Sequence, residues 1–294
     1  MPKRFKLSVL AIFLCSFELT ADPVSSLLEG DSYYIQKQYN LAHLYYSEIY
    51  KNRPTSATAS RLLLSSLRLH DTKLIENLIS SRTEGDFTFN YLSLYSAYIL
   101  NKPQISDLLT NSLKQSAKYQ QNQPQFEYLT GAWLLNLQKF DAASIVYSNL
   151  SQQNSEVGQQ SRQIVIELGQ IESLPHKSPW LAAIFSTVIP GSGQIYSRQF
   201  SDGVMALFWN ATFLGGAFYV NRLETLANRP HYGSGFLGLF GLMFYASNIA
   251  GGYSSAYRYN VFHQRKFVER LRKIHFSIDT IEEFSGIEFS RPIQ

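Results

Sequence analysis

The sequence predicts an all-helical protein in which helical hairpins are followed by a small transmembrane domain. Two observations predict this fold. Small and apolar residues recur with a 34-residue period in the first part of the chain, and two later segments without charge are long enough to cross a bilayer. The expected divisions are a signal peptide (1–21), a repeat domain (22–172), a membrane domain (173–254), and a basic amphipathic helix with an acidic tail (255–294).

The composition argues against several classes of protein. The chain has 26 Lys and Arg against 22 Asp and Glu, and this near balance gives no support to bulk nucleic-acid binding. The single cysteine, Cys15, excludes an internal disulfide and a cysteine zinc site. The six histidines are scattered, without a pair at ligand spacing, and no common hydrolase motif occurs. We therefore expect a protein that is not an enzyme and has no metal or cofactor.

The N-terminal head has the pattern of a signal peptide. A cationic start that ends at Lys6 precedes a mostly apolar run of nine residues, Leu7 to Cys15, and a small residue follows at Ala21. The apolar run is too short to span a bilayer stably. We expect export of the following domain, with cleavage near Ala21. Acylation of Cys15 is the alternative.

Residues 23 to 157 contain four windows of 34 residues. The first places Gly30, Tyr33, Ala42, Tyr46 and Pro54 at positions 8, 11, 20, 24 and 32. Windows that start at 90 and 124 repeat the small or apolar character of positions 8, 20 and 24, whereas the window near 56 keeps only apolar residues. Small residues at positions 8 and 20 let two helices approach closely, and an aromatic residue at position 24 fills the remaining gap. These positions predict packing and not catalysis.

This pattern resembles the tetratricopeptide repeat. The resemblance implies a solenoid of helical hairpins whose concave surface binds segments of partner proteins. Tyrosine and asparagine suit such contacts, because a rigid ring buries area at low entropic cost. The outward positions on the first helix of each unit are the candidate partner-binding residues: Asp31, Tyr34, Tyr91, Tyr98, Asn101, Tyr128 and Asn136. Packing between repeats is the alternative role of the tyrosines.

The membrane domain is defined by its lack of charge, with five charged residues between positions 179 and 252. Segments 203–220 and 233–252 are each long enough to cross about 30 Å of hydrocarbon, and a shorter uncharged segment covers 180–196. Three crossings would place Arg198 and the six cations of residues 253–275 on the cytoplasmic side, opposite an exported repeat domain. We expect three spans and a cytoplasmic C-terminus. A re-entrant or interfacial 180–196 is the alternative.

The run from Pro190 to Gly203 resembles the P-G-x-G-Q-x-Y…D-G signature of small bacterial integral-membrane domains, which are often fused to soluble repeats. The matching residues are Pro190, Gly191, Gly193, Gln194, Tyr196, Asp202 and Gly203. Proline and glycine at a membrane interface break a helix and leave backbone groups to be satisfied. We expect Gln194 and Asp202 to satisfy them and Tyr196 to lie at headgroup level. A binding nest for an anion or a substrate is the alternative.

Two amides, Asn210 and Asn248, lie inside the long spans, where such groups usually face another helix. The pairs Ala211 with Gly215 and Ala246 with Ala250 are the expected small packing faces. Neither span contains an ionisable residue, which argues against a carrier of protons or ions.

The basic segment has apolar residues at helical spacing, from Val261 to Ile274, and predicts an amphipathic helix on the inner leaflet. A solvated extension of the last span is the alternative. The final residues, 276 to 294, suggest a short irregular acidic end.

Together the patterns predict a scaffold or adaptor of the bacterial cell envelope. Its expected partners are proteins of unknown identity and membrane lipid, without nucleic acid. The alternative function makes the membrane domain the active part, as an accessory subunit in transport or membrane-protein biogenesis. A secreted or outer-membrane protein is a third possibility.

Overall fold

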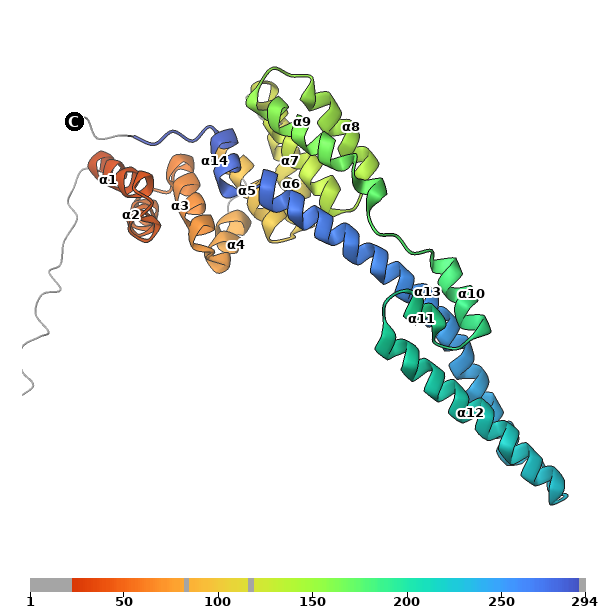
Figure 1. The fold of residues 1–294 in the computed structure, drawn as a ribbon. Helices are drawn as coiled ribbons and strands as arrows, with labels where there is room; N and C mark the ends of the chain where they lie inside the picture. Colours follow the sequence, from red (N-terminus) through yellow and green to blue (C-terminus); the bar gives the residue numbers. More distant parts are fainter. Residues whose placement is uncertain (1–22, 82–84, 116–118, 291–294) are drawn as a thin grey trace, which may run out of the picture. The chain divides into compact units, whose positions relative to one another are not determined.

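The structure is a computed structural model that describes residues 23–81, 85–115 and 119–290 (Figure 1). The signal peptide expected at residues 1–21 lies outside these residues. All the regular structure in the described ranges is helical. The chain divides into two compact units: unit 1 is Met1–Phe126 with Ile278–Gln294, and unit 2 is Glu127–Ser277.

Each unit combines helical hairpins with part of the C-terminal region. The helices of unit 1 are α1 (Pro23–Ile35), α2 (Tyr39–Asn52), α3 (Ser56–Leu69), α4 (Thr72–Ser81), α5 (Phe87–Ile99), α6 (Pro103–Gln115), the 3₁₀ turn η1 (Gln120–Asn122) and α14 (Ile278–Ser285). Helix α7 (Gln123–Asn136) begins in unit 1 and continues in unit 2. The others of unit 2 are α8 (Phe140–Ser151), α9 (Glu156–Leu168), η2 (Ile171–Ser173), α10 (Pro179–Val188), α11 (Ser192–Tyr196), α12 (Phe200–Leu226) and α13 (Tyr232–His275).

The same turn closes all four hairpins, α1–α2, α3–α4, α5–α6 and α7–α8. One residue between the two helices adopts a left-handed conformation, with φ between 54° and 61°. The next backbone N–H then bonds the carbonyl five residues earlier, as in a Schellman motif. The left-handed residues are Lys37, His70, Asn101 and Gln138. The four predicted windows therefore each fold into one pair of helices.

The glycines at position 8 of the first and fourth windows let the two helices of a hairpin approach. A Cβ added at Gly30 would lie 2.8 Å from the ring of Tyr46, and one added at Gly131 would lie 2.5 Å from the ring of Tyr147. Both tyrosines are fully buried. The predicted pairing of a small residue at position 8 with an aromatic at position 24 is thus a contact inside one hairpin.

The C-terminal segment of unit 1 differs from the irregular end that the sequence suggests. Residues 278–285 form α14, whose Ile281 and Phe284 are buried. This helix packs on α5 and α3, and Thr88 Oγ1 donates a 3.0 Å hydrogen bond to the carbonyl of Ser285. Gly286, with φ of 66°, ends the helix. The expectation of an irregular end is wrong here because apolar spacing inside the acidic sequence gives α14 a face to bury.

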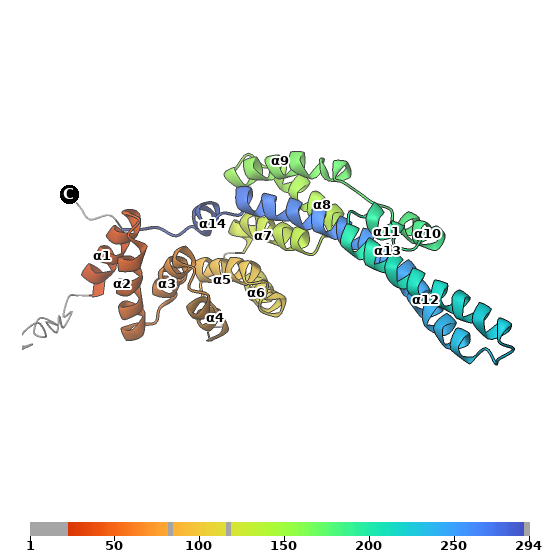
Figure 2. The ribbon, with the colours of Figure 1, turned by 60° about the horizontal axis from the view of Figure 1, so that its bottom comes forward.

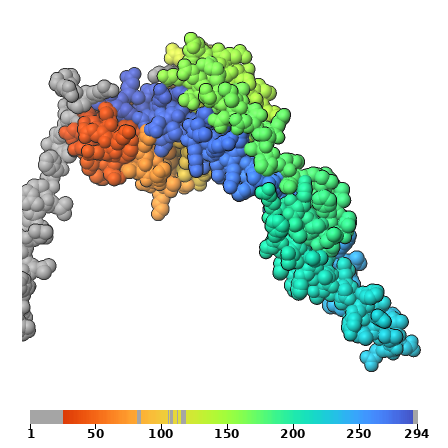
Figure 3. All heavy atoms as spheres, in the orientation of Figure 1, coloured from red at the N-terminus to blue at the C-terminus, as the bar shows by residue number. Residues whose placement is uncertain are grey.

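Helices α12 and α13 of unit 2 lie side by side (Figures 1 and 2). They contain 27 and 44 residues, and both are long and apolar enough to cross a membrane. Only 11% and 17% of their most apolar windows are buried, whereas the core helix of a soluble protein is mostly buried. In the face drawn in Figure 3, no other segment covers their far ends. Stacked rings join them, with centroids 4.7 Å apart for Phe213 and Phe244.

The segment 180–196 does not form one span. It is divided at Ile189–Gly191 into α10, with 10 residues, and α11, with five. The peptide N–H of Lys177 donates to Asn260 on α13, and that of Gly191 donates to Asn248, about 18 Å further along the same helix. The chain then returns, so that Gln199 meets Ser255 at 2.9 Å. The segment therefore begins and ends beside the same stretch of α13, residues 255–260, as in the re-entrant alternative.

The basic part of α13 continues the helix and packs on protein. Its apolar residues Phe267, Val268 and Leu271 are buried in unit 2, and the ring of Phe267 lies 6.4 Å from that of Phe140 on α8. The Tyr128 hydroxyl on α7 donates a 2.9 Å hydrogen bond to the carbonyl of His275. The end of α13 therefore packs on the repeat helices α7 and α8 of unit 2.

Candidate peptide-binding site

A buried ion pair lies at the centre of the site in unit 1. Asp31 on α1 is completely buried, and it accepts hydrogen bonds from Arg61 Nε at 2.7 Å and Arg61 Nη2 at 3.0 Å. The Tyr46 hydroxyl donates a third bond to Asp31, at 2.8 Å. A two-pronged arginine pair fixes both side chains in one geometry. Helices α1, α2 and α3 thus hold a rigid acceptor and donor side by side.

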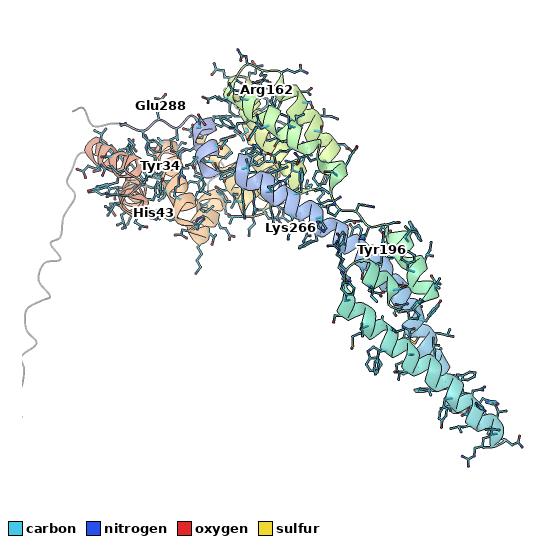
Figure 4. All side chains as sticks on the ribbon, viewed as in Figure 1. Tyr34, His43, Arg162, Tyr196, Lys266 and Glu288 are labelled. Carbon is cyan, nitrogen blue, oxygen red and sulfur yellow. The ribbon has the colours of Figure 1, made fainter. Side chains whose placement is uncertain are left out.

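This pair binds the main chain of the segment after α14. Arg61 Nη2 donates to the carbonyl oxygen of Glu288 at 2.7 Å, and the peptide N–H of Ser290 donates to Asp31 Oδ2 at 2.8 Å. The two bonds are made to residues two apart in a segment without regular secondary structure. Figure 4 labels Glu288, which comes from the C-terminal segment, and Tyr34, which comes from α1. Asp31 of α1 and Arg61 of α3 therefore hold the chain's own C-terminal segment through its main chain.

The residue between the two main-chain bonds, Phe289, supplies a side-chain contact. Its ring stacks on Tyr34, with centroids 4.5 Å apart and planes 14° apart. The Arg61 guanidinium lies 5.6 Å from the centre of the same ring. Stacked aromatic pairs contribute about 0.5–1.5 kcal/mol beyond burial, so the ring adds a side-chain contribution to the two main-chain bonds.

A second cluster holds α14 on the same helices. Glu282 Oε2 accepts from the Tyr34 hydroxyl at 2.7 Å and from Arg68 Nη2 at 2.5 Å. Burial raises the pKa of Tyr34 above its usual value, and the Glu282 charge raises it further. Burial lowers the pKa of Arg68, but its bonds to Tyr34 and Glu282 more than offset this and leave the pKa raised. Tyr34 therefore remains a donor and Arg68 remains a cation. We call Asp31, Tyr34, Arg61 and Arg68 the tail-binding site.

The structure brings together two of the seven candidate partner-binding residues, Asp31 and Tyr34, at this site. Tyr128 contacts the chain's own C-terminal region as well, since it bonds His275 and its ring lies 5.1 Å from Phe276. The other four candidates lie elsewhere. Tyr91 and Tyr98 are buried in α5, Asn101 is exposed in the turn after α5, and Asn136 is half-buried at the end of α7. Burial of Tyr91, Tyr98 and Tyr128 favours the packing interpretation for these three rings.

Sequence reasoning missed Arg61, Arg68 and the tail itself. The two arginines stand seven residues apart in α3, on one helical face, but in the window with the weakest repeat signature. The tail carries the tripeptide Glu-Phe-Ser twice, at 283–285 and 288–290. This repeated acidic and aromatic motif was the feature of the sequence that could have indicated a specific role for the tail.

The sequence motif of the membrane domain forms a closed polar network in unit 2. Asn248 Oδ1 accepts from the N–H of Gly191 at 2.8 Å, and Asn248 Nδ2 donates to the carbonyl of Ser186 at 2.9 Å. Gln194 donates to the Asn248 carbonyl at 3.1 Å and accepts from the Ser186 hydroxyl at 3.1 Å. The Ser186 oxygen also accepts from the N–H of Gly193 at 3.2 Å. These bonds satisfy the backbone that the break at Pro190 leaves open.

The glycines of the motif are places of close backbone approach. A Cβ on Gly191 would lie 2.0 Å from the carbonyl oxygen of Gly203, and a Cβ on Gly193 would lie 2.0 Å from that of Ala182. Gly252 on α13 meets the same turn of α10, with Ser186 Oγ 2.4 Å from its added Cβ. The motif therefore has the geometry of a packing device.

The remaining motif residues have separate positions. Tyr196 accepts a 3.2 Å bond from the N–H of Ser178, and Lys177 Nζ lies 4.5 Å from the centre of its ring. Asp202 is exposed in the first turn of α12, where a negative charge suits the helix dipole. Asn210 is buried, and Nδ2 donates to the Ala206 carbonyl of its own helix at 2.8 Å.

The packing faces of α12 and α13 differ from the expected ones. All four residues of the expected small faces, Ala211, Gly215, Ala246 and Ala250, are exposed. The close approach is instead at Gly241, where an added Cβ would lie 2.6 Å from Leu214. The aromatic stack at Phe213 and Phe244 sets the orientation of the pair.

Comparison of the chain with family models, curated proteins and solved structures finds no match. The described residues contain no group of three or more His, Cys, Asp or Glu side chains placed to hold a metal ion.

Proposed function

We propose that the protein is a membrane-anchored scaffold of the bacterial cell envelope, which binds partner proteins through a helical-repeat domain of tetratricopeptide type. The observation that supports this proposal most directly is the ion pair of Asp31 and Arg61. It holds two main-chain groups of an extended segment, and main-chain bonds do not depend on the sequence of the segment bound. A surface that binds one peptide in this manner is suited to bind others.

The membrane anchor of this proposal is the pair α12 and α13, with α10 and α11 as a re-entrant element. Large apolar side chains such as Trp180, Phe208 and Phe218 are exposed on these helices. In water such a surface would favour aggregation, whereas in a bilayer these side chains would contact the apolar lipid chains. The turn at Gly191 lies about 15 Å along α13 from Arg258, which is close to half of the hydrocarbon thickness.

This arrangement has two crossings, with the repeats and the tail on one side and the turn at Arg229 on the other. We propose that the repeat side is the exported side of the inner membrane. The cationic and apolar head supports export, because the first apolar segment usually dominates orientation. The cations after Tyr257 disfavour export of this side less than their number suggests, because domains translocate largely regardless of charge.

Cysteine labelling tests the topology. In a chain with Cys15→Ser, single cysteines are introduced at three exposed positions: Lys51, Arg229 and Glu288. A maleimide that does not cross membranes is added to spheroplasts. We expect Lys51→Cys and Glu288→Cys to react at once, and Arg229→Cys to react only after the membrane is permeabilised. Different accessibility of positions 51 and 288 would contradict two crossings, and the reverse pattern would contradict export.

Crosslinking followed by pull-down from detergent-solubilised membranes tests binding. A Tyr34→Ala variant removes the ring on which Phe289 stacks, so we expect recovery of crosslinked partners to fall about tenfold, equivalent to about 1.4 kcal/mol. Tyr33→Ala, on the same helix, is the matched control, since Tyr33 contacts the ring of Tyr45. Undiminished recovery with Tyr34→Ala would contradict the proposal. Loss of function in Asn210→Leu alone would favour a membrane domain that is itself active.

A further inference from the structure

We propose that residues 287–290 are an exchangeable occupant of the tail-binding site, and that a partner protein displaces them with an extended segment that carries an aromatic ring. This inference rests on the scaffold function proposed above and names the chemistry of its partner. Helix α14 remains in place during the exchange.

The contacts of the exchangeable segment are few and are general to peptides. Two are the main-chain bonds of Glu288 and Ser290 to Arg61 and Asp31, which any residue can make except proline at the donor position. The side chains of Glu288 and Ser290 are exposed. A different sequence at these two positions would therefore keep both bonds.

The ring of Phe289 supplies the specificity. It stacks on Tyr34 at 4.5 Å and lies under the Arg61 guanidinium at 5.6 Å, and both neighbours are fixed by other bonds. Tyr34 donates to Glu282, and Arg61 is paired with Asp31. An incoming segment consequently needs a phenylalanine, tyrosine or tryptophan between its two main-chain contacts. The incoming segment needs no particular charge, because the charges of Asp31 and Arg61 neutralise each other.

Gly286 separates helix α14, which makes many buried contacts with unit 1, from residues 287–290, which make few. Before it, α14 buries Ile281 and Phe284 and bonds Arg68 through Glu282. After it, Glu288 and Ser290 are exposed, and Ile287 and Phe289 are half-buried. Glycine with a positive φ turns freely at this point. Segments with few buried contacts open at low free energy, so release of residues 287–290 leaves the rest of unit 1 folded.

The test uses the full chain in detergent with Cys15→Ser and a fluorescent dye on Glu288→Cys, a position whose side chain is exposed and whose carbonyl alone is used. The probe is a synthetic peptide with the sequence of residues 285–290. Because a tethered segment has an effective concentration in the millimolar range, the peptide is added to about 10 mM. We expect the dye anisotropy to fall most of the way to that of a released reference, the same chain with Phe289→Ala.

A peptide in which the phenylalanine is replaced by alanine is the matched control, and we expect it to leave the anisotropy unchanged. If the natural peptide also leaves it unchanged while Phe289→Ala lowers it, the segment does not exchange. If Phe289→Ala itself has no effect, the ring does not hold the segment, and the inference fails as well. Peptide exchange without partner recovery would contradict the scaffold function alone, and partner recovery without exchange would contradict this inference alone.

Discussion

The Gly191→Ala variant is expected to lose about 3 kcal/mol or more of folding free energy in the membrane domain. Gly191 has a φ of 90°, a conformation that costs a residue with a Cβ about 1–3 kcal/mol. The new methyl would also lie 2.0 Å from the carbonyl oxygen of Gly203, so the main chain must move. That movement breaks the bond from Gly191 N–H to Asn248, which leaves buried groups unpaired at about 1–3 kcal/mol.

Thermal unfolding of the detergent-solubilised protein measures this effect. Gly215→Ala is the matched control, because an added Cβ there meets no atom within 4 Å. Alanine is the better helix former by about 1 kcal/mol, so this control is expected to be neutral or slightly more stable than the natural chain. Equal unfolding temperatures for the two variants would contradict the assigned role of Gly191.

The Arg61→Met variant is expected to destabilise unit 1 by about 3–5 kcal/mol, because it leaves the Asp31 carboxylate buried without its cation. The tail segment loses its bond to the Glu288 carbonyl in the same variant. Chemical unfolding followed by circular dichroism gives the change in free energy. Lys102→Met is the control, since Lys102 pairs with Glu76 at 3.2 Å with both side chains nearly half exposed. Such exposed pairs contribute about 0–1 kcal/mol.

The double variant Asp31→Leu with Arg61→Met distinguishes two causes of destabilisation. One is a buried charge left without its partner, and the other is the loss of the contact itself. Removing both charges avoids the uncompensated carboxylate, so we expect the double variant to be more stable than either single one. A double variant as unstable as the sum of the single changes would contradict this account of the site. The double variant still loses some folding free energy relative to the natural chain. The reason is that the Tyr46 hydroxyl no longer has Asp31 as its hydrogen-bond acceptor.

The sequence predicts the hairpins well because their determinants are local. The spacing of Gly30 and Tyr46 within one window reports directly on a contact that the structure contains. Asp31 and Tyr34, which the sequence predicts as contacts for partner proteins, lie against a peptide segment of the same chain. The peptide is the chain's own tail, more than 220 residues away in the sequence, and no periodicity links two segments at that separation.

The membrane domain shows the limit of hydropathy as a guide. The segment 180–196 has the apolar character of a span, but hydropathy does not report that Ser186 and Gln194 find partners on α13. Those partners let the chain turn back at Pro190. The exposed small residues Ala211 and Gly215 illustrate a related problem, since small size permits close packing but does not say which neighbour approaches.

Helix α13 has 44 residues without interruption and is therefore about 66 Å long. Its first half lies against α12 and α10, and its last turns lie among α7, α8 and α9. Unit 2 has no hinge between these two regions of the helix. A displacement at one end of this continuous helix is consequently carried to the other end, so that the packing of α12 and α10 is mechanically coupled to that of α7–α9.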